Sequence, residues 1–325
     1  MIQGLPRVRR TIGRSALSRV TFRLSVCATS LARSSLEFTP LHSSLGAIVE
    51  GVDCNNDFAD QANVLKSALA RWQVLLFRGQ DLSDGAFLAF CRNFGELELL
   101  PEPEKRHPEY PEIFNLTNVR PDGSLTHRDD PQAVFLRGTQ RWHTDSSFRE
   151  VPCLATILYA VTVPPEGGDT EFANMTAAFD SLSAAEQVEF ARLDVVHSYA
   201  FSRSANPGKL DDMSAEELAL VPDVVHPLVR EHADGRASIY LGGHASHIDG
   251  LDVEQSRAQI RAREERLTAV GNVYRHQWQQ GDLLIWDNRP TLHRLTGYQI
   301  DRHARVMRRC TVTGRERVVP LRNRA

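Results

Sequence analysis

The 325-residue chain is predicted to form a single domain that is mainly β, with helices packed outside the strands. Two apolar runs, at residues 72–78 and 155–163, have the length and composition of buried strands. Strand-type patterns then dominate from Val273 toward the C-terminus. No internal repeat and no second hydrophobic core is apparent, and a chain of this length can bury one large core.

The N-terminal segment differs in composition from the rest of the chain. Residues 1–35 contain seven arginines and many serines, and no acidic residue precedes Glu37. This composition is typical of a mitochondrial or plastid transit peptide, and an upstream extension from a wrongly chosen start codon explains it equally well. We therefore predict a basic extension with little order over residues 1–35, one folded domain over 36–318 and a tail over 319–325.

The first part of the predicted domain combines a helix, a strand and a second helix. Residues 60–71 have apolar side chains at helical spacing, and the buried strand at 72–78 follows directly. Ser83 is a typical N-cap residue for the second helix. The apolar face of that helix is an aromatic-rich stripe, which we assign to the core: Phe87, Phe90, Cys91 and Phe94.

The middle of the chain contains one long polar segment and two predicted helices. Residues 96–140 are rich in Pro, Glu and Asp and have no sustained periodicity, which is typical of a functional lid or a disordered excursion. Ser183 and Glu186 match a capping box that begins a helix running toward Leu193. Residues 252–267 have the alternating charges of a surface helix.

Charge, apolar content and cysteine use restrict the class of protein. The net charge of −3 gives no reason to expect a nucleic acid or membrane partner. No apolar run approaches the roughly 18 residues of a membrane span. The five cysteines, at positions 27, 54, 91, 153 and 310, show no paired spacing and are typical of reduced thiols in an intracellular protein. We expect a cytoplasmic protein, or a mitochondrial one if residues 1–35 are a transit peptide, and leave homo-oligomer formation open.

Three His-x-Asp pairs occur in the chain, beginning at His127, His143 and His247. Residues i and i+2 of a strand point to the same side, so both side chains of such a pair can hold one ion. The surrounding sequence separates the three pairs. Only His143 has aromatic residues on both sides and a strand-like run soon after, whereas His127 lies in a polar loop and His247 in a glycine-bounded segment.

A metal site built on His143 and Asp145 needs a third ligand from a distant part of the chain. His293, which follows the run 286–292, is the candidate. Two imidazoles and one carboxylate on one face of a metal form the facial triad of non-heme Fe(II) oxygenases. These residues therefore predict an Fe(II) centre whose opposite face is open.

Residues 305–312 have a strand pattern, and one face of this strand carries both Arg305 and Arg309. Planar guanidinium groups bind carboxylates through two hydrogen bonds and keep their charge at any working pH. Two arginines on one face thus suit the recognition of two carboxylates. A solvated edge strand is the alternative interpretation, because Arg302 and Arg308 also lie nearby.

Taken together, these motifs resemble those of the Fe(II)- and 2-oxoglutarate-dependent dioxygenases of the taurine dioxygenase family. The likeness is greatest to the 2,4-dichlorophenoxyacetate dioxygenase branch. The matching segments follow family order over about residues 36 to 315. They are residues 38–51, 142–148, 164–172, 243–251, 273–282 and 286–293, followed by the arginine strand. Each segment alone is weakly specific, and the ordered set is highly specific for the family.

The resemblance implies a fold and a role for each matching residue. The fold would be a double-stranded β-helix, the cupin-like jelly roll, with helices outside it. The implied ligands of Fe(II) are His143, Asp145 and His293. Thr170 and Arg305 would hold the distal carboxylate of the cosubstrate 2-oxoglutarate, and Arg309 would face the substrate anion or the edge of the cosubstrate.

One departure from the family pattern concerns spacing. The segment between His293 and Arg305 is one residue longer than the family pattern, so we expect an insertion within residues 294–301. This insertion leaves the register of Arg305 against Arg302 open, and the pair of arginines four residues apart favours Arg305.

The resemblance also implies a reaction. Oxidative decarboxylation of 2-oxoglutarate with O2 would give succinate and CO2 while a C–H bond of a small anionic substrate is hydroxylated. If that carbon bears an ether oxygen, as in an aryloxyalkanoate, collapse of the hemiacetal would release a phenol. The alternatives are a taurine or alkylsulfonate dioxygenase, a zinc hydrolase with the same three ligands, and a non-enzymatic jelly-roll binding module.

Other residues near the motifs are assigned supporting roles. The residues expected in the core, behind the ligands or in the walls of the site are His244, His247, His276, Trp142 and Phe148. Asp169 is expected to brace the turn that presents Thr170.

Overall fold

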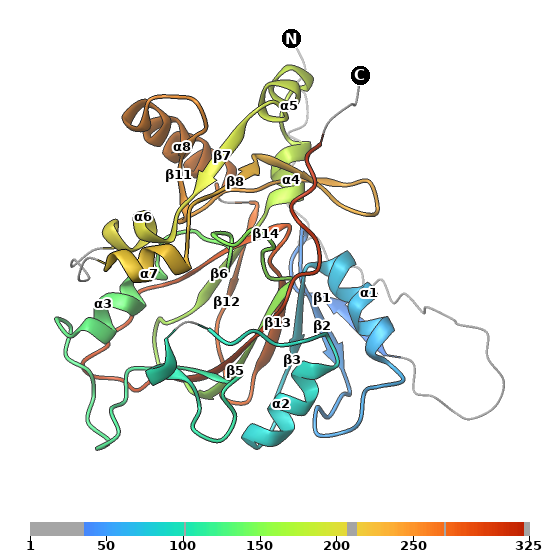
Figure 1. The fold of residues 1–325 in the computed structure, drawn as a ribbon. Coiled ribbons are helices and arrows are strands. Elements are labelled where there is room, and N and C mark those ends of the chain that lie inside the picture. Colours follow the sequence, from blue (N-terminus) through green and yellow to red (C-terminus); the bar gives the residue numbers. More distant parts are fainter. Residues whose placement is uncertain (1–35, 101, 207–212, 270, 322–325) are drawn as a thin grey trace, which may run out of the picture.

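The computed structural model describes residues 36–321 except residues 101, 207–212 and 270. The predicted extension over residues 1–35 and the last four residues of the predicted tail lie outside the described residues. The described chain is mainly β with helices around the strands, as predicted (Figure 1). No helix in this part of the chain is long and apolar enough to cross a membrane.

The strands are short, and most of them lie in the second half of the chain. Their bounds are β1 Glu37–Pro40, β2 Ala47–Glu50, β3 Val74–Phe77, β4 Phe114–Thr117, β5 Ala155–Thr162, β6 Thr170–Asn174, β7 Asp194–His197, β8 Val224–Pro227, β9 Val229–Glu231, β10 Ala237–Ile239, β11 Ala245–Ile248, β12 Val273–His276, β13 Leu283–Asp287, β14 Thr291–Leu295 and β15 Val306–Val312. The helices are α1 Ala62–Trp72, α2 Asp84–Arg92, α3 Pro131–Gly138, α4 Met175–Asp180, α5 Ala184–Phe190, α6 Tyr199–Ser204, α7 Ala215–Leu220 and α8 Val253–Leu267, with a 3-10 turn at Pro103–Lys105.

The largest sheet has the strand order β1-β2-β3-β13-β5-β15-β4. Its neighbours are antiparallel, except that β2 and β3 are parallel. Alternate residues of its central strands enter two different cores, because side chains of a strand point to opposite faces in turn. In β13, Leu283 and Ile285 pack into one core, whereas Leu284 and Trp286 pack into the other.

Helices α1 and α2 cover one face of the large sheet (Figure 1). Ser83 is the N-cap of α2, and its hydroxyl accepts a hydrogen bond from the Ala86 amide at 3.1 Å. The predicted aromatic stripe is buried in the core beneath these helices: Phe87, Phe90, Cys91 and Phe94. Because helices close this face, the functional side chains described below lie on the other one.

A three-stranded sheet, β12-β6-β14, packs on that opposite face. Phe172 of β6 joins the two sheets, since it packs in one cluster with Leu158 and Met307 of the large sheet. Its ring also meets that of Trp286 edge-on, with 5.4 Å between the ring centroids. Strands of both sheets therefore border one interior, and both contribute side chains to the site.

The remaining strands form the small sheets β11-β7-β8 and β10-β9, which pack with α4, α5 and α8 around a third cluster. Ser183 and Glu186 form the predicted capping box at the start of α5. Asp252 caps α8 by accepting a hydrogen bond from the Gln255 amide at 3.0 Å. The apolar side chains thus form three clusters, where the sequence pattern predicted one core.

Residues 96–140 contain more regular structure than predicted. Strand β4 pairs with β15 at the edge of the large sheet, and α3 begins at Pro131. The sequence gives no periodic signal for β4, because a four-residue edge strand depends on its partner strand rather than on its own pattern. The alternative of a disordered excursion was therefore wrong, and α3 is a wall of the site, whereas the functional lid stays a prediction.

Candidate metal centre and the two cavities beside it

The structure brings together one of the three His-x-Asp pairs with the predicted third ligand. Ligand atoms of His143, Asp145 and His293 all lie within 4.8 Å of one another, and no other group of this kind occurs among the described residues. His127 and its partner Asp129 are largely exposed, at 61% and 78% of their side-chain areas. His247 hydrogen-bonds Ser246 at 2.9 Å and joins no metal-ligand cluster in the described chain.

Backbone hydrogen bonds tie the two histidines to each other. The His143 amide donates to the His293 carbonyl at 3.0 Å, and the His293 amide donates back to the His143 carbonyl at 2.8 Å. His293 lies on β14, whereas His143 is in an isolated bridge and Asp145 is in the turn that follows. The expectation of a strand carrying both His143 and Asp145 was therefore wrong, and the turn is formed with Ser146 in a left-handed conformation, at a φ of 54°.

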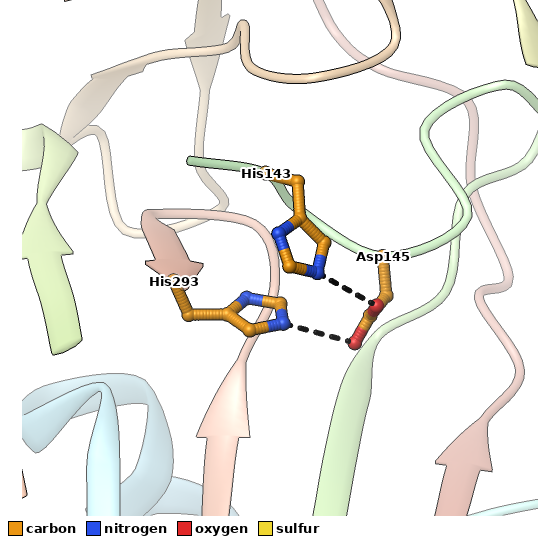
Figure 2. Close-up of side chains that lie close together, drawn as sticks. All are labelled: His143, Asp145 and His293. Carbon is orange, nitrogen blue, oxygen red and sulfur yellow. Dashed lines mark ion pairs between the residues drawn. The ribbon is translucent and has the colours of Figure 1, made fainter. Parts of the chain in front are cut away.

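The side chains of the three residues converge (Figure 2). Nε2 of His143 lies 3.9 Å from Oδ1 of Asp145, and Nε2 of His293 lies 3.6 Å from Oδ2. The Nδ1 atom of His143 donates a hydrogen bond to the Arg141 carbonyl at 2.8 Å. This bond fixes the tautomer, so Nε2 of His143 presents a lone pair toward the carboxylate and toward a metal ion.

Gly242 lets a neighbouring loop pack directly against the first ligand. Its φ is +128°, and a Cβ at this position would lie 3.0 Å from the Cα atom of His143. A Cβ this close would require a shift of a few tenths of an ångström, and the positive φ already disfavours any residue other than glycine. The glycine-rich segment 242–243 is thus part of the wall around His143.

Asp145 is buried and held by several groups. Thr156 donates a hydrogen bond to Oδ2 at 2.6 Å, and Nη2 of Arg309 lies 3.0 Å from Oδ1. Burial opposes ionisation of Asp145, but Arg309 and the two imidazoles outweigh it and hold the pKa of this carboxyl below its usual range. Burial also lowers the pKa of His143 and of His293. The site therefore offers one carboxylate and two neutral imidazoles, which is the donor set of non-heme iron.

A cavity of about 60 Å³ lies on one side of the three ligands, and Thr170 and Arg305 line it. Arg305 is buried, and its Nε donates to the Gly168 carbonyl at 3.2 Å. Among the described residues no carboxylate forms an ion pair with it. Burial lowers the pKa of Arg305 to about 10, although Tyr298 and Asp169 oppose this shift. A buried cation without an anionic partner is expensive, so this cavity is suited to a carboxylate.

The surroundings of the inner cavity include the two arginines of the open register and the turn before β6. Arg302 is exposed, whereas Arg305 lines the cavity. Thr170 is held in place by Trp278, whose Nε1 donates to Thr170 Oγ1 at 3.0 Å. Asp169 braces the turn, as predicted: its amide donates to Thr296 Oγ1 at 3.0 Å, and its carboxylate pairs with Arg275 at 2.7 Å.

A second cavity of about 130 Å³ lies on the outer side of the ligands. Both cavities are bordered by His143, Asp145 and Arg309 and by Phe135 and Thr139, whereas the third ligand, His293, lines the inner cavity and not the outer one. Helix α6 contributes only to the outer one. The aromatic and aliphatic side chains of the outer cavity are Leu100, Phe114, Phe135, Phe148 and Tyr199.

Sequence reasoning missed several residues of the outer cavity. Phe135 of α3 and Tyr199 of α6 had no signal, because neither short helix stands out by its periodicity. Arg141 was overlooked beside the more conspicuous residues that follow it. His244, for which a supporting role and direct substrate contact were both open, hydrogen-bonds Ser147 at 3.1 Å and lines the outer cavity.

Three residues that were expected to have structural roles are found in the core or in the cavity wall. His276 is fully buried and lies 3.2 Å from Asp282, as expected for a structural histidine. Trp142 packs into the third core cluster, and Phe148 forms part of the cavity wall. The four cysteines among the described residues are free and buried.

Several known proteins are similar to this chain in sequence and in fold. Residues 37–311 match the family model "Taurine catabolism dioxygenase TauD, TfdA family". The chain is 39% identical over 277 residues to the alpha-ketoglutarate-dependent 2,4-dichlorophenoxyacetate dioxygenase of Cupriavidus pinatubonensis, which covers 84% of this chain and 96% of that protein. It is 32% identical over 272 residues to the (S)-phenoxypropionate/alpha-ketoglutarate-dioxygenase of Sphingobium herbicidovorans, covering 81% and 90%. The crystal structure of AAD-2 in complex with Mn(II) and N-oxalylglycine superposes with a TM-score of 0.79 at 34% identity, covering 87% of this chain and 100% of that one.

Proposed function

Because this chain belongs to the taurine catabolism dioxygenase TauD, TfdA family and is a 2-oxoglutarate-dependent dioxygenase that uses Fe(II), 2-oxoglutarate and O2, we propose that it cleaves the ether bond of a small aryloxyalkanoate. The substrate is an organic carboxylate. The coproducts of the reaction are succinate and CO2. Three assignments support this function: a metal centre, a cosubstrate anchor and a substrate cavity.

The metal centre is assigned to His143, Asp145 and His293. This assignment is supported by the convergence of two neutral imidazoles and one ionised carboxylate. The Nε2 atoms of both rings are turned toward the carboxylate. Bound Fe(II) supplies the oxidising chemistry with O2 and 2-oxoglutarate. The chain itself holds the ligands in place through the His143–His293 bridge and the hydrogen bond from Thr156 to Asp145.

The cosubstrate anchor is assigned to Arg305, a buried cation in the inner cavity with no ion-pair partner among the described residues. We assign it, with Thr170, to the distal carboxylate of 2-oxoglutarate. A planar guanidinium suits this role because it binds a carboxylate through two hydrogen bonds. Gly168 supports the arrangement, since a Cβ there would lie 3.3 Å from Cδ of Arg305.

The outer cavity is assigned to the organic substrate, and its lining is the observation that carries the proposed ether cleavage. Its wall of aromatic and aliphatic side chains suits an aryl ring, and Arg309 places a positive charge beside the metal ligands. The relatives named above act on 2,4-dichlorophenoxyacetate and (S)-phenoxypropionate, which combine these two features. Hydroxylation at the carbon that bears the ether oxygen gives a hemiacetal. Its carbon–oxygen bond then breaks, which releases a phenol and leaves a carbonyl on the former side chain.

The proposal also covers the type of β fold, the bounds of the domain and the cellular compartment. The large sheet and the sheet β12-β6-β14, which face each other across one apolar cluster, are assigned to the two halves of a double-stranded β-helix. The dioxygenase domain is assigned to residues 36–318. Its compartment is assigned to the cytoplasm.

The test is product formation by the purified protein with Fe(II), 2-oxoglutarate and O2. We expect phenol and succinate from phenoxyacetate in equal amounts. Taurine serves as the comparison, with sulfite as its product. Sulfite without phenol would replace the aryloxyalkanoate assignment with a sulfonate one, and slow succinate release without either product would leave only the reaction class.

A further inference from the structure

Three arginines line the outer cavity, and they differ in how their charges are satisfied. Arg309 is paired with Asp145, with 3.0 Å between Nη2 and Oδ1. Arg203 interacts with Tyr199, whose hydroxyl also donates to Glu102 at 3.0 Å. Arg141 is different, because no carboxylate forms an ion pair with it among the described residues.

The contacts of the Arg141 side chain are weak. Its Nη2 donates to the Gly243 carbonyl at 3.3 Å, and its guanidinium carbon lies 5.8 Å from the ring centre of Phe201. The Arg141 side chain is half-buried and lines the outer cavity, and no carboxylate among the described residues, Glu264 included, forms an ion pair or hydrogen bond with it. Arg141 thus brings a partly desolvated positive charge to the cavity wall without a matching anion.

The backbone fixes Arg141 relative to the metal centre. It lies two residues before His143, and its carbonyl accepts the hydrogen bond from Nδ1 of that ligand. It lines the outer cavity together with His143 and His244. Arg309 enters the cavity from β15, so the two arginines come from different elements of the fold.

From these contacts we propose that Arg141 is a specificity-determining residue that binds the anionic group of the organic substrate. The inference rests on the proposed function. Arg309 already shares its charge with Asp145, whereas Arg141 has donors for a carboxylate and loses little when it turns from the Gly243 carbonyl toward one. Charged hydrogen bonds of this kind are the strong ones, and they reject a neutral analogue that leaves the cation unpaired.

A structural role is the competing explanation, because Arg141 also contacts Phe201 of α6. The chain offers a matched control in Arg257, whose guanidinium lies 4.5 Å from the ring centre of Phe201 and which does not line the outer cavity. Arg257→Gln removes a cation from the same aromatic ring without changing the cavity wall. Loss of a merely structural cation would therefore affect both variants.

The experiment is anaerobic calorimetric titration of the full chain loaded with Mn(II) and 2-oxoglutarate, with phenoxyacetate and neutral phenoxyacetamide as probes. For Arg141→Gln we expect the Kd of phenoxyacetate to rise at least about tenfold, while the Kd values of phenoxyacetamide and 2-oxoglutarate change less than about twofold. Arg141→Lys should be intermediate, because it keeps the charge and loses the planar pair of donors. Arg257→Gln should bind all three compounds as the unmodified protein does.

The outcomes separate this inference from the proposed function. Unchanged phenoxyacetate binding by Arg141→Gln would overturn the inference alone, and so would equal losses of acid and amide binding. If the unmodified protein neither binds phenoxyacetate nor releases phenol from it, the proposed function is wrong and the inference falls with it.

Discussion

Arg308 and Arg309, adjacent on β15, point to opposite faces of the large sheet. Arg308 pairs with Asp84 of α2 at 2.9 Å, on the helix-covered face, whereas Arg309 pairs with Asp145 on the face that carries the site. The alternation of a strand thus separates a structural arginine from a functional one. It also provides a control one residue away for the test of Arg309.

That test concerns the organic substrate. Arg309→Ala should weaken binding of phenoxyacetate far more than binding of 2-oxoglutarate, because Arg309 adds a second positive charge to the outer cavity beside that of Arg141. It should also increase succinate formation without phenol, since a poorly placed substrate uncouples the two halves of the reaction. Succinate and phenol are measured together. Arg308→Ala should keep the ratio of the two products unchanged, and an equal loss of coupling in both variants would contradict the role of Arg309.

A second prediction concerns the metal. Anaerobic addition of Fe(II) and 2-oxoglutarate should produce a visible metal-to-ligand charge-transfer band, and His143→Ala should abolish it by removing one of three ligands. His127→Ala and His247→Ala should leave the band intact, because neither residue joins a metal-ligand cluster in the described chain. Equal loss of the band in all three variants would show that the wrong His-x-Asp pair has been chosen.

The cosubstrate anchor gives a third prediction. Loss of one partner of a buried charged pair costs roughly 2–5 kcal/mol. Arg305→Ala should therefore raise the Kd of 2-oxoglutarate at least about tenfold, since about 1.4 kcal/mol corresponds to one factor of ten. Arg302→Ala should change it less than about twofold, because Arg302 is exposed. Titration of 2-oxoglutarate against the Mn(II)-loaded protein measures both, and the reverse ranking would refute the register.

Stability should depend on pH through Glu264. Burial raises the pKa of Glu264 to about 7 in the folded protein, from a usual value of 4.5. The folded state therefore binds this proton more tightly than the unfolded state, and the free energy of unfolding falls as pH rises through that window. Glu264→Gln should gain about 1–2 kcal/mol over the unmodified protein at pH 8 and little at pH 5, at about 1.4 kcal/mol per unit with a discount for partial exposure.

Urea unfolding at both pH values measures this difference. Glu265→Gln is the control, because Glu265 is the exposed neighbour on the same helix. Equal stabilisation by Glu264→Gln at the two pH values would mean that the substitution acts by packing and not through the proton.

The sequence alone predicted the residues that carry strong local signals. His143 was distinguished by its aromatic neighbours, and His293 and Arg305 by the family order of their segments. The capping box of Ser183 and Glu186 and the buried strands also follow from local pattern, because caps and alternation involve residues close in sequence.

The missed features depend on contacts between distant segments. The bridge that joins His143 to His293 has no local signature, since each residue finds its partner across about half of the chain. Strand β4 forms only beside β15, and Tyr199 reaches the cavity only because α6 is placed next to α3. Arg141 carries no motif of its own. Only the fold shows that Arg141 lines the outer cavity and has no ion pair with a carboxylate among the described residues.

The division of the site into two cavities has a consequence for how new activities arise in this enzyme. The inner cavity is built largely from strands of the two facing sheets, whereas α6 borders the outer cavity alone. Substitutions in α6 can therefore change which substrate the outer cavity accepts. They leave unchanged the strands that line the inner cavity, which is assigned to 2-oxoglutarate. In directed evolution, a library confined to α6 should yield altered substrate range among variants that still consume 2-oxoglutarate.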